Sequence, residues 1–360
     1  MNEEQEADEL LRYVDYLQHQ LVVPKTEQQL SNEREWFILN RSSIADRLYQ
    51  VHSSKQESSE RINKTADRIL NFDFKTKNDA PFSQEIFGPV LSEILDIYEK
   101  VGMRPKASVS LFNSPNLTPS AFARPSVNGH LLFAGAGTFS FCNYWAKIFS
   151  TLLFELGEIN HLDYDENSVI LLLTEKNIGI NILRLVVHYS YAGTLSGFGK
   201  LEQDSKLMTG RALLVNAMEV FIIAHEVYHF KLEEDYPEQN GVPPDSTVKE
   251  MELLCDSMSL AISTVYGKKN NNPFSFQFLA PLIFFHSLKI CENGREYLLD
   301  EQKLKGDSHP TPQERIEWIY EFAKQAKVPS QVLESMQYIT SMAITIEAYT
   351  ESRLQLLNKE

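Results

Sequence analysis

Apolar and polar positions divide the chain into a helical first part and a more varied second part. Apolar residues recur at helical spacing on a charged background over residues 4–20 and 42–72, and again over Pro81–Tyr98, before Gly102. We therefore expect an N-terminal helical region over residues 1–104 that precedes or wraps the core.

Beyond residue 104 the pattern changes and short strands are expected. Ala107–Phe112 alternates as a strand does, and His130–Ala134 is a short apolar run before a glycine-containing turn. Asn143–Leu156 is predicted to be a helix, and the continuous apolar run Ser168–Leu173 is predicted to be a buried strand. Asn181–Tyr191 fits either a helix or a strand.

The rest of the chain is predicted to be helical. Gly210–Glu234 is strongly apolar with helical spacing, and a loop rich in Pro, Gly and Asp follows it. Thr247 and Glu250 match a capping box that begins a helix running to Tyr266, with Gly267 as its stop. Three further helices are expected over residues 274–291, 312–326 and 331–357. The expected fold class is therefore α+β, mostly helical, with a small sheet.

Charge limits the classes of partner. The 360 residues include 49 acidic and 34 basic side chains, which gives a formal net charge of −15, and no long run of Lys and Arg occurs. Because such a chain repels phosphate backbones and anionic surfaces, we expect neither a nucleic-acid nor a membrane partner.

Cysteine usage and the amino terminus bear on location. Cys142, Cys255 and Cys291 are few and unpatterned, so reduced thiols are expected. The start MNEEQEADELLRY is acidic and lacks the features of a signal peptide. Since no uninterrupted apolar stretch reaches the roughly 20 residues of a spanning helix, the sequence predicts a cytoplasmic protein.

The stretch HEVYH, from His225 to His229, carries the most specific chemical signal in the chain. It lies inside the apolar helix expected over Gly210–Glu234. Residues four apart share one helical face, so both imidazoles can bind one ion. A catalytic zinc takes three protein ligands and keeps one position open. We predict His225 and His229 as zinc ligands, and Glu226 as the general base toward metal-bound water.

Two acids on the following helix complete the predicted site. Glu252 comes after one loop and one helical turn, so a neighbouring helix can present its carboxylate to the same ion as the third ligand. Asp256, one turn later, can accept a hydrogen bond from the distal nitrogen of a ligand histidine and so fix its orientation. Cys255 is an alternative soft ligand, although it is rotated off the face that Glu252 and Asp256 share.

The order HExxH and then ExxxD resembles the gluzincin metallopeptidases, in particular the CAAX prenyl proteases and HtpX-type peptidases. That family carries a Thr/Ser-His-Pro followed by an Arg downstream of the glutamate ligand. This chain has Ser308-His309-Pro310 and then Arg315. The resemblance implies a zincin-like fold, one Zn²⁺ ion per chain and a protein or peptide substrate, with the metallopeptidase domain over residues 105–360.

The segment Ala121–Pro125 leading into Gly129–Leu132 is similar to the strand that lines the family's substrate cleft. The chain departs from the family in lacking predicted membrane helices and in the long segment between this strand and His225. A second resemblance, on the gluzincin-like layout without membrane helices, is to the Lit-type phage-exclusion peptidases.

The family parallel gives His309 a role in positioning substrate or stabilising the oxyanion that forms when water attacks a peptide carbonyl. The alternative is that His309 and Pro310 form the turn into a helix, with Arg315 in an ordinary ion pair.

The sequence thus predicts a zinc-dependent endopeptidase, with a stress or antiphage defence role. One alternative is an interaction protein whose zinc site is structural or vestigial. A fourth protein ligand, such as Cys255 or Asp256, would favour that alternative because a closed site has no position for water. A hydrolase of non-peptide amides is a third hypothesis.

Overall fold

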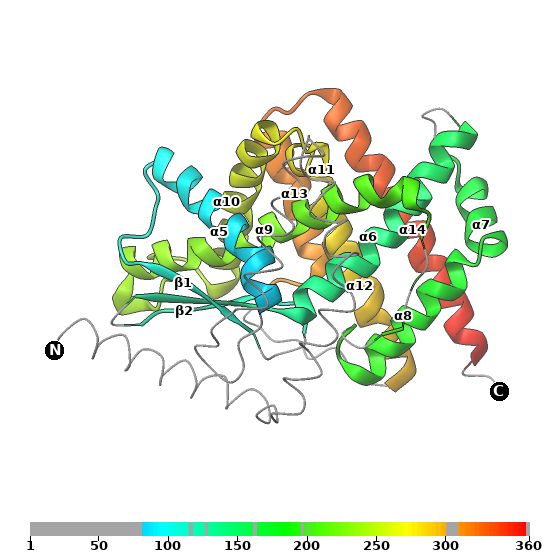
Figure 1. Cartoon of the computed structure of the whole chain (residues 1–360), viewed down its shortest axis with the longest axis horizontal. Helices are drawn as coiled ribbons and strands as arrows, with labels where there is room; N and C mark the ends of the chain where they lie inside the picture. The colour runs from blue at the N-terminus through cyan, green and yellow to red at the C-terminus, as the bar shows by residue number, and fades with distance from the viewer. Residues whose placement is uncertain are drawn as a thin grey trace.

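The computed structural model describes residues 81–357, with gaps at 115–117, 127–128, 161–163, 196–197, 200, 202 and 300–308. The helices expected over residues 4–20 and 42–72, and Ser308, lie outside the described residues. The described part is mostly helical with one small three-stranded sheet, as the sequence predicts (Figure 1). A zincin-like arrangement stays a prediction.

The described helices and strands follow one another as α5 (Pro81–Lys100), β1 (Val109–Asn113), β2 (Phe122–Arg124), β3 (His130–Ala134), α6 (Ala136–Asn160), α7 (Glu166–Glu175), α8 (Ile178–Ala192), α9 (Met208–Asp235), α10 (Val248–Lys269), α11 (Pro273–Phe276), α12 (Leu279–Leu299), α13 (Pro312–Gln325) and α14 (Ser330–Leu357). Short 3-10 turns, η1 (Ser205–Leu207) and η2 (Pro237–Gln239), flank α9.

Helix α9 lies at the centre of the fold. It contacts α5, α6, α10, α11 and α12, as well as strands β2 and β3. Every residue from Ala217 to Ala224 is buried, so this segment is enclosed on all sides. Among the described residues α9 alone has the length and hydropathy of a membrane-spanning helix, but 78% of its most apolar window is buried inside the fold. Such burial is typical of a core helix.

Helix α5 packs against α9. The Tyr98 hydroxyl donates a 2.9 Å hydrogen bond to the Ala224 carbonyl, and the Tyr98 ring stacks on Tyr228 with centroids 6.4 Å apart. Phe87, Ile94 and Tyr98 belong to the same apolar core as α9. The domain boundary expected at residue 104 stays a prediction.

The sheet has the strand order β1-β3-β2, with β1 parallel and β2 antiparallel to β3. Its central strand β3 is fully buried: Leu132 and Ala134 face the main core, whereas Leu131 and Phe133 join a small cluster on the opposite face. In the described sheet, β2 is therefore an edge strand, and it contacts α9.

The strands predicted over Ala107–Phe112 and His130–Ala134 are confirmed as β1 and β3. The strand predicted over Ser168–Leu173 is wrong. These residues belong to helix α7, because the Asp165 side chain accepts hydrogen bonds from the Asn167 and Ser168 amides and caps the helix. A short apolar run does not by itself distinguish a buried strand from a helix. The ambiguous segment Asn181–Tyr191 is helical and lies in α8.

Helix α10 begins at the predicted capping box but continues through Gly267 to Lys269, so the expected stop at Gly267 is wrong. Gly267 is required for packing against α11. A Cβ atom there would lie 2.6 Å from Ser275 Cβ and 2.8 Å from the Phe276 amide nitrogen. The helix expected over residues 274–291 is divided into α11 and α12, and Phe278 at the junction has a φ of 60°.

We predict that Gly267→Ala destabilises the protein, although Gly→Ala inside a helix usually stabilises by about 0.5–1 kcal/mol. The added methyl meets backbone atoms of α11 that cannot move independently, and such overpacking costs about 1–3 kcal/mol. The matched control is Gly157→Ala in α6, an exposed position with nothing within 4 Å. Urea unfolding should show a lower free energy of unfolding for Gly267→Ala and a higher one for Gly157→Ala. A gain for both would contradict the close packing.

We predict that buried His286 makes the fold acid-sensitive. Burial, and then the charge of Lys289, lowers its pKa to about 4, and its side chain is only 3% exposed. The unfolded chain, with a pKa near 6.5, then binds more protons, so stability falls as pH drops from about 6.5 to about 4. The contribution reaches roughly 3 kcal/mol at most. In His286→Leu the free energy of unfolding should depend less on pH between about 4 and 6.5 than in the wild type. An unchanged pH dependence would refute the role of His286.

Candidate metal centre

The predicted site residues meet where α9, α10 and α13 come together. Helix α9 supplies His225 and His229, α10 supplies Glu252 and Asp256, and α13 supplies Arg315. Helix α10 packs against both α9 and α13, so residues far apart in the sequence lie within hydrogen-bonding distance of one another.

The three predicted ligands converge on one point. His225 Nε2 lies 3.1 Å from His229 Nε2 and 3.3 Å from Glu252 Oε2, while His229 Nε2 lies 3.6 Å from Glu252 Oε1. Ligands 2.0–2.1 Å from a tetrahedral zinc are separated from one another by about 3.3 Å. The spacing of these side chains therefore fits a zinc ion.

Asp256 lies on the far side of the His225 ring, as expected. His225 Nδ1 donates to Asp256 Oδ1 at 2.9 Å, which leaves Nε2 directed toward His229 and Glu252. This hydrogen bond selects the tautomer that a metal ligand needs. Asp256 is fully buried, and its Oδ2 has no hydrogen-bond partner among the described residues.

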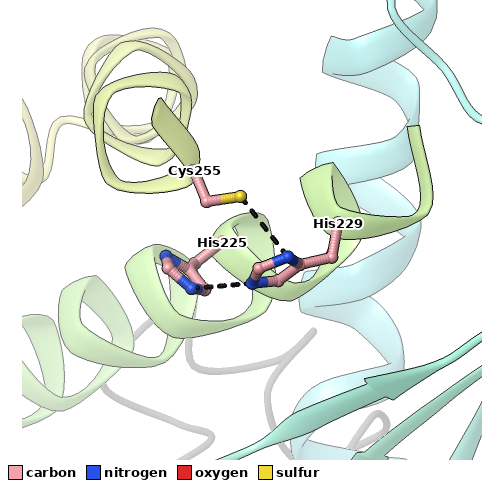
Figure 2. Close-up of side chains that lie close together, drawn as sticks. All are labelled: His225, His229 and Cys255. Carbon is pink, nitrogen blue, oxygen red and sulfur yellow. Dashed lines mark hydrogen bonds between the residues drawn. The ribbon is translucent and has the colours of Figure 1, made fainter. Parts of the chain in front are cut away.

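Cys255 contacts His229 at Nδ1, whereas Nε2 of the same ring faces His225 (Figure 2). Its Sγ lies 3.5 Å from His229 Nδ1, and His225, His229 and Cys255 form a group that could hold a metal ion. Burial raises the pKa of the Cys255 thiol well above its ordinary value, and the nearby carboxylates add to this. The sulfur of the neutral thiol can accept a weak hydrogen bond from His229 Nδ1, in the direction in which Asp256 accepts from His225 Nδ1. Sequence reasoning considered Cys255 only as a metal ligand and missed this contact with His229 Nδ1.

Arg315 connects the two acids of α10. Its Nη2 donates to Glu252 Oε2 at 2.7 Å, and its Nη1 donates to Asp256 Oδ1 at 2.8 Å. The guanidinium lies over the Phe285 ring, 5.3 Å from its centroid. The ion pair expected for Arg315 is thus made with two predicted site residues. A buried pair of carboxylates needs such compensation.

The charges differ between the two histidines. Burial lowers the pKa of both imidazoles, but hydrogen bonds with Asp256 and Glu252 outweigh it at His225 and raise that pKa to about 9. At His229, burial and the charge of His225 lower the pKa to about 3, so His229 is neutral at pH 7. For Glu252, burial opposes ionisation, but the histidines and Arg315 hold its pKa well below the usual range.

Glu226 has the electrostatics expected of a general base. Burial raises the pKa of its carboxyl to about 7, and Glu252 adds to the shift, while the positive charges of His225 and Arg315 and the Ala123 amide oppose it. A base is most effective when its pKa lies near the working pH. Because Ala123 belongs to β2, its amide also places the edge strand beside Glu226.

His309 lies at the exposed side of the cluster. Its side chain is 66% exposed, and its Nε2 is 3.4 Å from Glu252 Oε1. The turn that it occupies leads into α13 through a capping box formed by Thr311 and Glu314, with Pro312 at the first helical position. His309 therefore lies in the turn that leads into a helix, as one prediction has it, and it also lies beside a predicted ligand.

No family model matches the chain, and no curated protein or solved structure matches it. The resemblance to gluzincins therefore stays a prediction, and the interpretation of the site depends on its own geometry.

We predict that Asp256→Asn weakens zinc binding about 10- to 100-fold, since it disturbs the hydrogen bond that orients His225. Competition against a chromogenic chelator measures the affinity. The matched control is Asp235→Asn at the end of helix α9, where the carboxylate pairs with Lys231 outside the cluster. Equal zinc affinity in both variants would contradict an orienting role for Asp256.

Proposed function

We propose that the protein is a zinc-dependent peptidase. The convergence of His225 Nε2, His229 Nε2 and the Glu252 carboxylate at tetrahedral spacing carries the proposal. When bound there, zinc supplies a Lewis acid that polarises a carbonyl and acidifies water. The remaining chemistry belongs to the side chains around it.

Glu226 moves the proton. With a pKa of about 7, its carboxyl accepts a proton near neutral pH and returns it to the departing amine. The Ala123 amide steadies this carboxylate, and Arg315 offsets the charge of Glu252 and Asp256. In this proposal His309, which is exposed and lies beside Glu252, donates a hydrogen bond to the carbonyl oxygen as negative charge develops on it.

The edge strand favours a peptide substrate over a small amide. Among the described strands, β2 pairs with β3 along one side and with none along its other side, where the backbone of an extended segment would add to the sheet. The same strand contacts Glu226 through Ala123. A polypeptide paired with β2 would therefore lie beside the general base.

A second candidate function is an interaction protein with a structural metal site. The observation that favours it is the His225, His229 and Cys255 group, because sulfur ligation is frequent in closed zinc sites. Substitution with Co²⁺ separates the two candidate functions. An intense sulfur-to-cobalt absorption band indicates Cys255 as a ligand, and its absence supports the nitrogen and carboxylate set.

We predict that Glu226→Gln retains zinc but loses peptidase activity by about 100-fold or more, because the amide cannot accept the proton. Zinc content is measured by mass spectrometry of metals, and cleavage by peptide mapping of an unfolded protein substrate such as casein. The matched control is Glu238→Gln in the exposed turn η2.

Full peptidase activity in zinc-loaded Glu226→Gln would refute the mechanism. Absence of cleavage by the wild type, together with a sulfur-ligated Co²⁺ spectrum, would favour the structural site instead.

A further inference from the structure

A groove lies between α8 and the C-terminal part of α14. Figure 1 shows these two helices at the end of the molecule away from the sheet. Its volume is about 580 Å³, within the range of small-molecule sites. The groove uses none of the residues of the metal centre, so its role is independent of the proposed peptidase function.

The groove is mainly apolar. Ile180, Leu183 and Val187 line it from α8, and Leu356 lines it from α14. Ile180 is 49% exposed and Leu356 is 54% exposed, so large aliphatic side chains face water at its edge. A contiguous apolar surface with a few polar groups is typical of a site for an apolar ligand.

Two arginines give the groove a positive charge. Arg184 and Arg353 both line it, and neither makes an ion pair with any residue in the described ranges. Arg184 instead lies over the Phe198 ring, 5.6 Å from its centroid, and Arg353 lies over Tyr349 at 5.3 Å. In a chain of net charge −15 with abundant carboxylates, two unpaired guanidinium groups at one apolar groove favour an anionic ligand.

His188 provides a third polar group. Its ring meets Phe198 edge-on at 5.4 Å, and its buried Nε2 has no hydrogen-bond partner among the described residues. A buried polar atom without a partner is uncommon in folded proteins. Phe198, which also lines the groove, is held in place by Tyr144, whose hydroxyl donates a 2.6 Å hydrogen bond to the Phe198 carbonyl. Arg184 and His188 thus gather around one fixed aromatic ring.

We propose that this groove binds a free single-chain carboxylate amphiphile of the fatty-acid class. The hydrocarbon chain lies along Leu183, Val187 and Leu356. The carboxylate is recognised by Arg184 and Arg353, which both line the groove.

Isothermal titration of the full chain with dodecanoate, below its micelle concentration, tests the proposal. We expect saturable one-site binding that weakens at least about tenfold in the double variant Arg184→Gln/Arg353→Gln, since both charge-assisted contacts are lost. Arg104→Gln, an exposed arginine paired with Glu99 on α5, is the matched control and should bind as the wild type does. Dodecanol, which has the same chain without the charge, should bind at least about tenfold more weakly than dodecanoate.

Leu183→Trp provides a second test, because the larger side chain occupies the groove and should abolish binding while circular dichroism stays unchanged. Equal dodecanoate affinity in the wild type and the double arginine variant would overturn the proposal. So would binding of an acidic peptide or an anionic vesicle, at the same arginines, by a chain that does not bind dodecanoate.

Discussion

The burial of opposite charges between α9, α10 and α13 is the constraint on which the rest of the structure depends. Glu252 and Asp256 lie in the interior of a helical protein, where an uncompensated carboxylate costs several kcal/mol. Arg315 and His225 supply the compensation through hydrogen bonds of 2.7–2.9 Å. The three helices therefore cannot slide past one another without leaving a charge unpaired.

Neighbouring elements hold this arrangement in register. Capping boxes at Thr247 and Thr311 fix where α10 and α13 begin, and Lys249 pairs with Glu314 between the two helices. Tyr98 of α5 supports α9 close to the histidines, and the Ala123 amide of β2 contacts Glu226. The small sheet thus contributes more to the site than its size suggests, since one of its amides reaches Glu226, the proposed general base.

Sequence reasoning named side chains that do lie close together in the fold, because helical periodicity is a local property. The spacing of His225 and His229 puts both imidazoles on one face, and the capping box at Thr247 sets the helix that brings Glu252 and Asp256 to them. It failed at Ser168–Leu173 and at Gly267, where the outcome depends on an N-cap and on a neighbouring turn that a pattern of apolar residues does not encode. The contact between Cys255 and His229 Nδ1 depends on side-chain direction and on how closely two helices pack. The groove beside α8 joins segments far apart in the chain, so no local signal marks it.

The pairing of Arg315 with Glu252 and Asp256 has a consequence for the order of assembly. The two histidines and the two acids occur within one helix pair, whereas Arg315 follows Glu252 by 63 positions and Asp256 by 59. During synthesis the chain is made from its amino terminus onward. A growing chain therefore presents two carboxylates and two imidazoles before the guanidinium that balances them has been made. At that stage the acids of α10 have, among the described residues, only His225 as a cationic partner, so the charge pairing between α9 and α10 is complete only after α13 has been made.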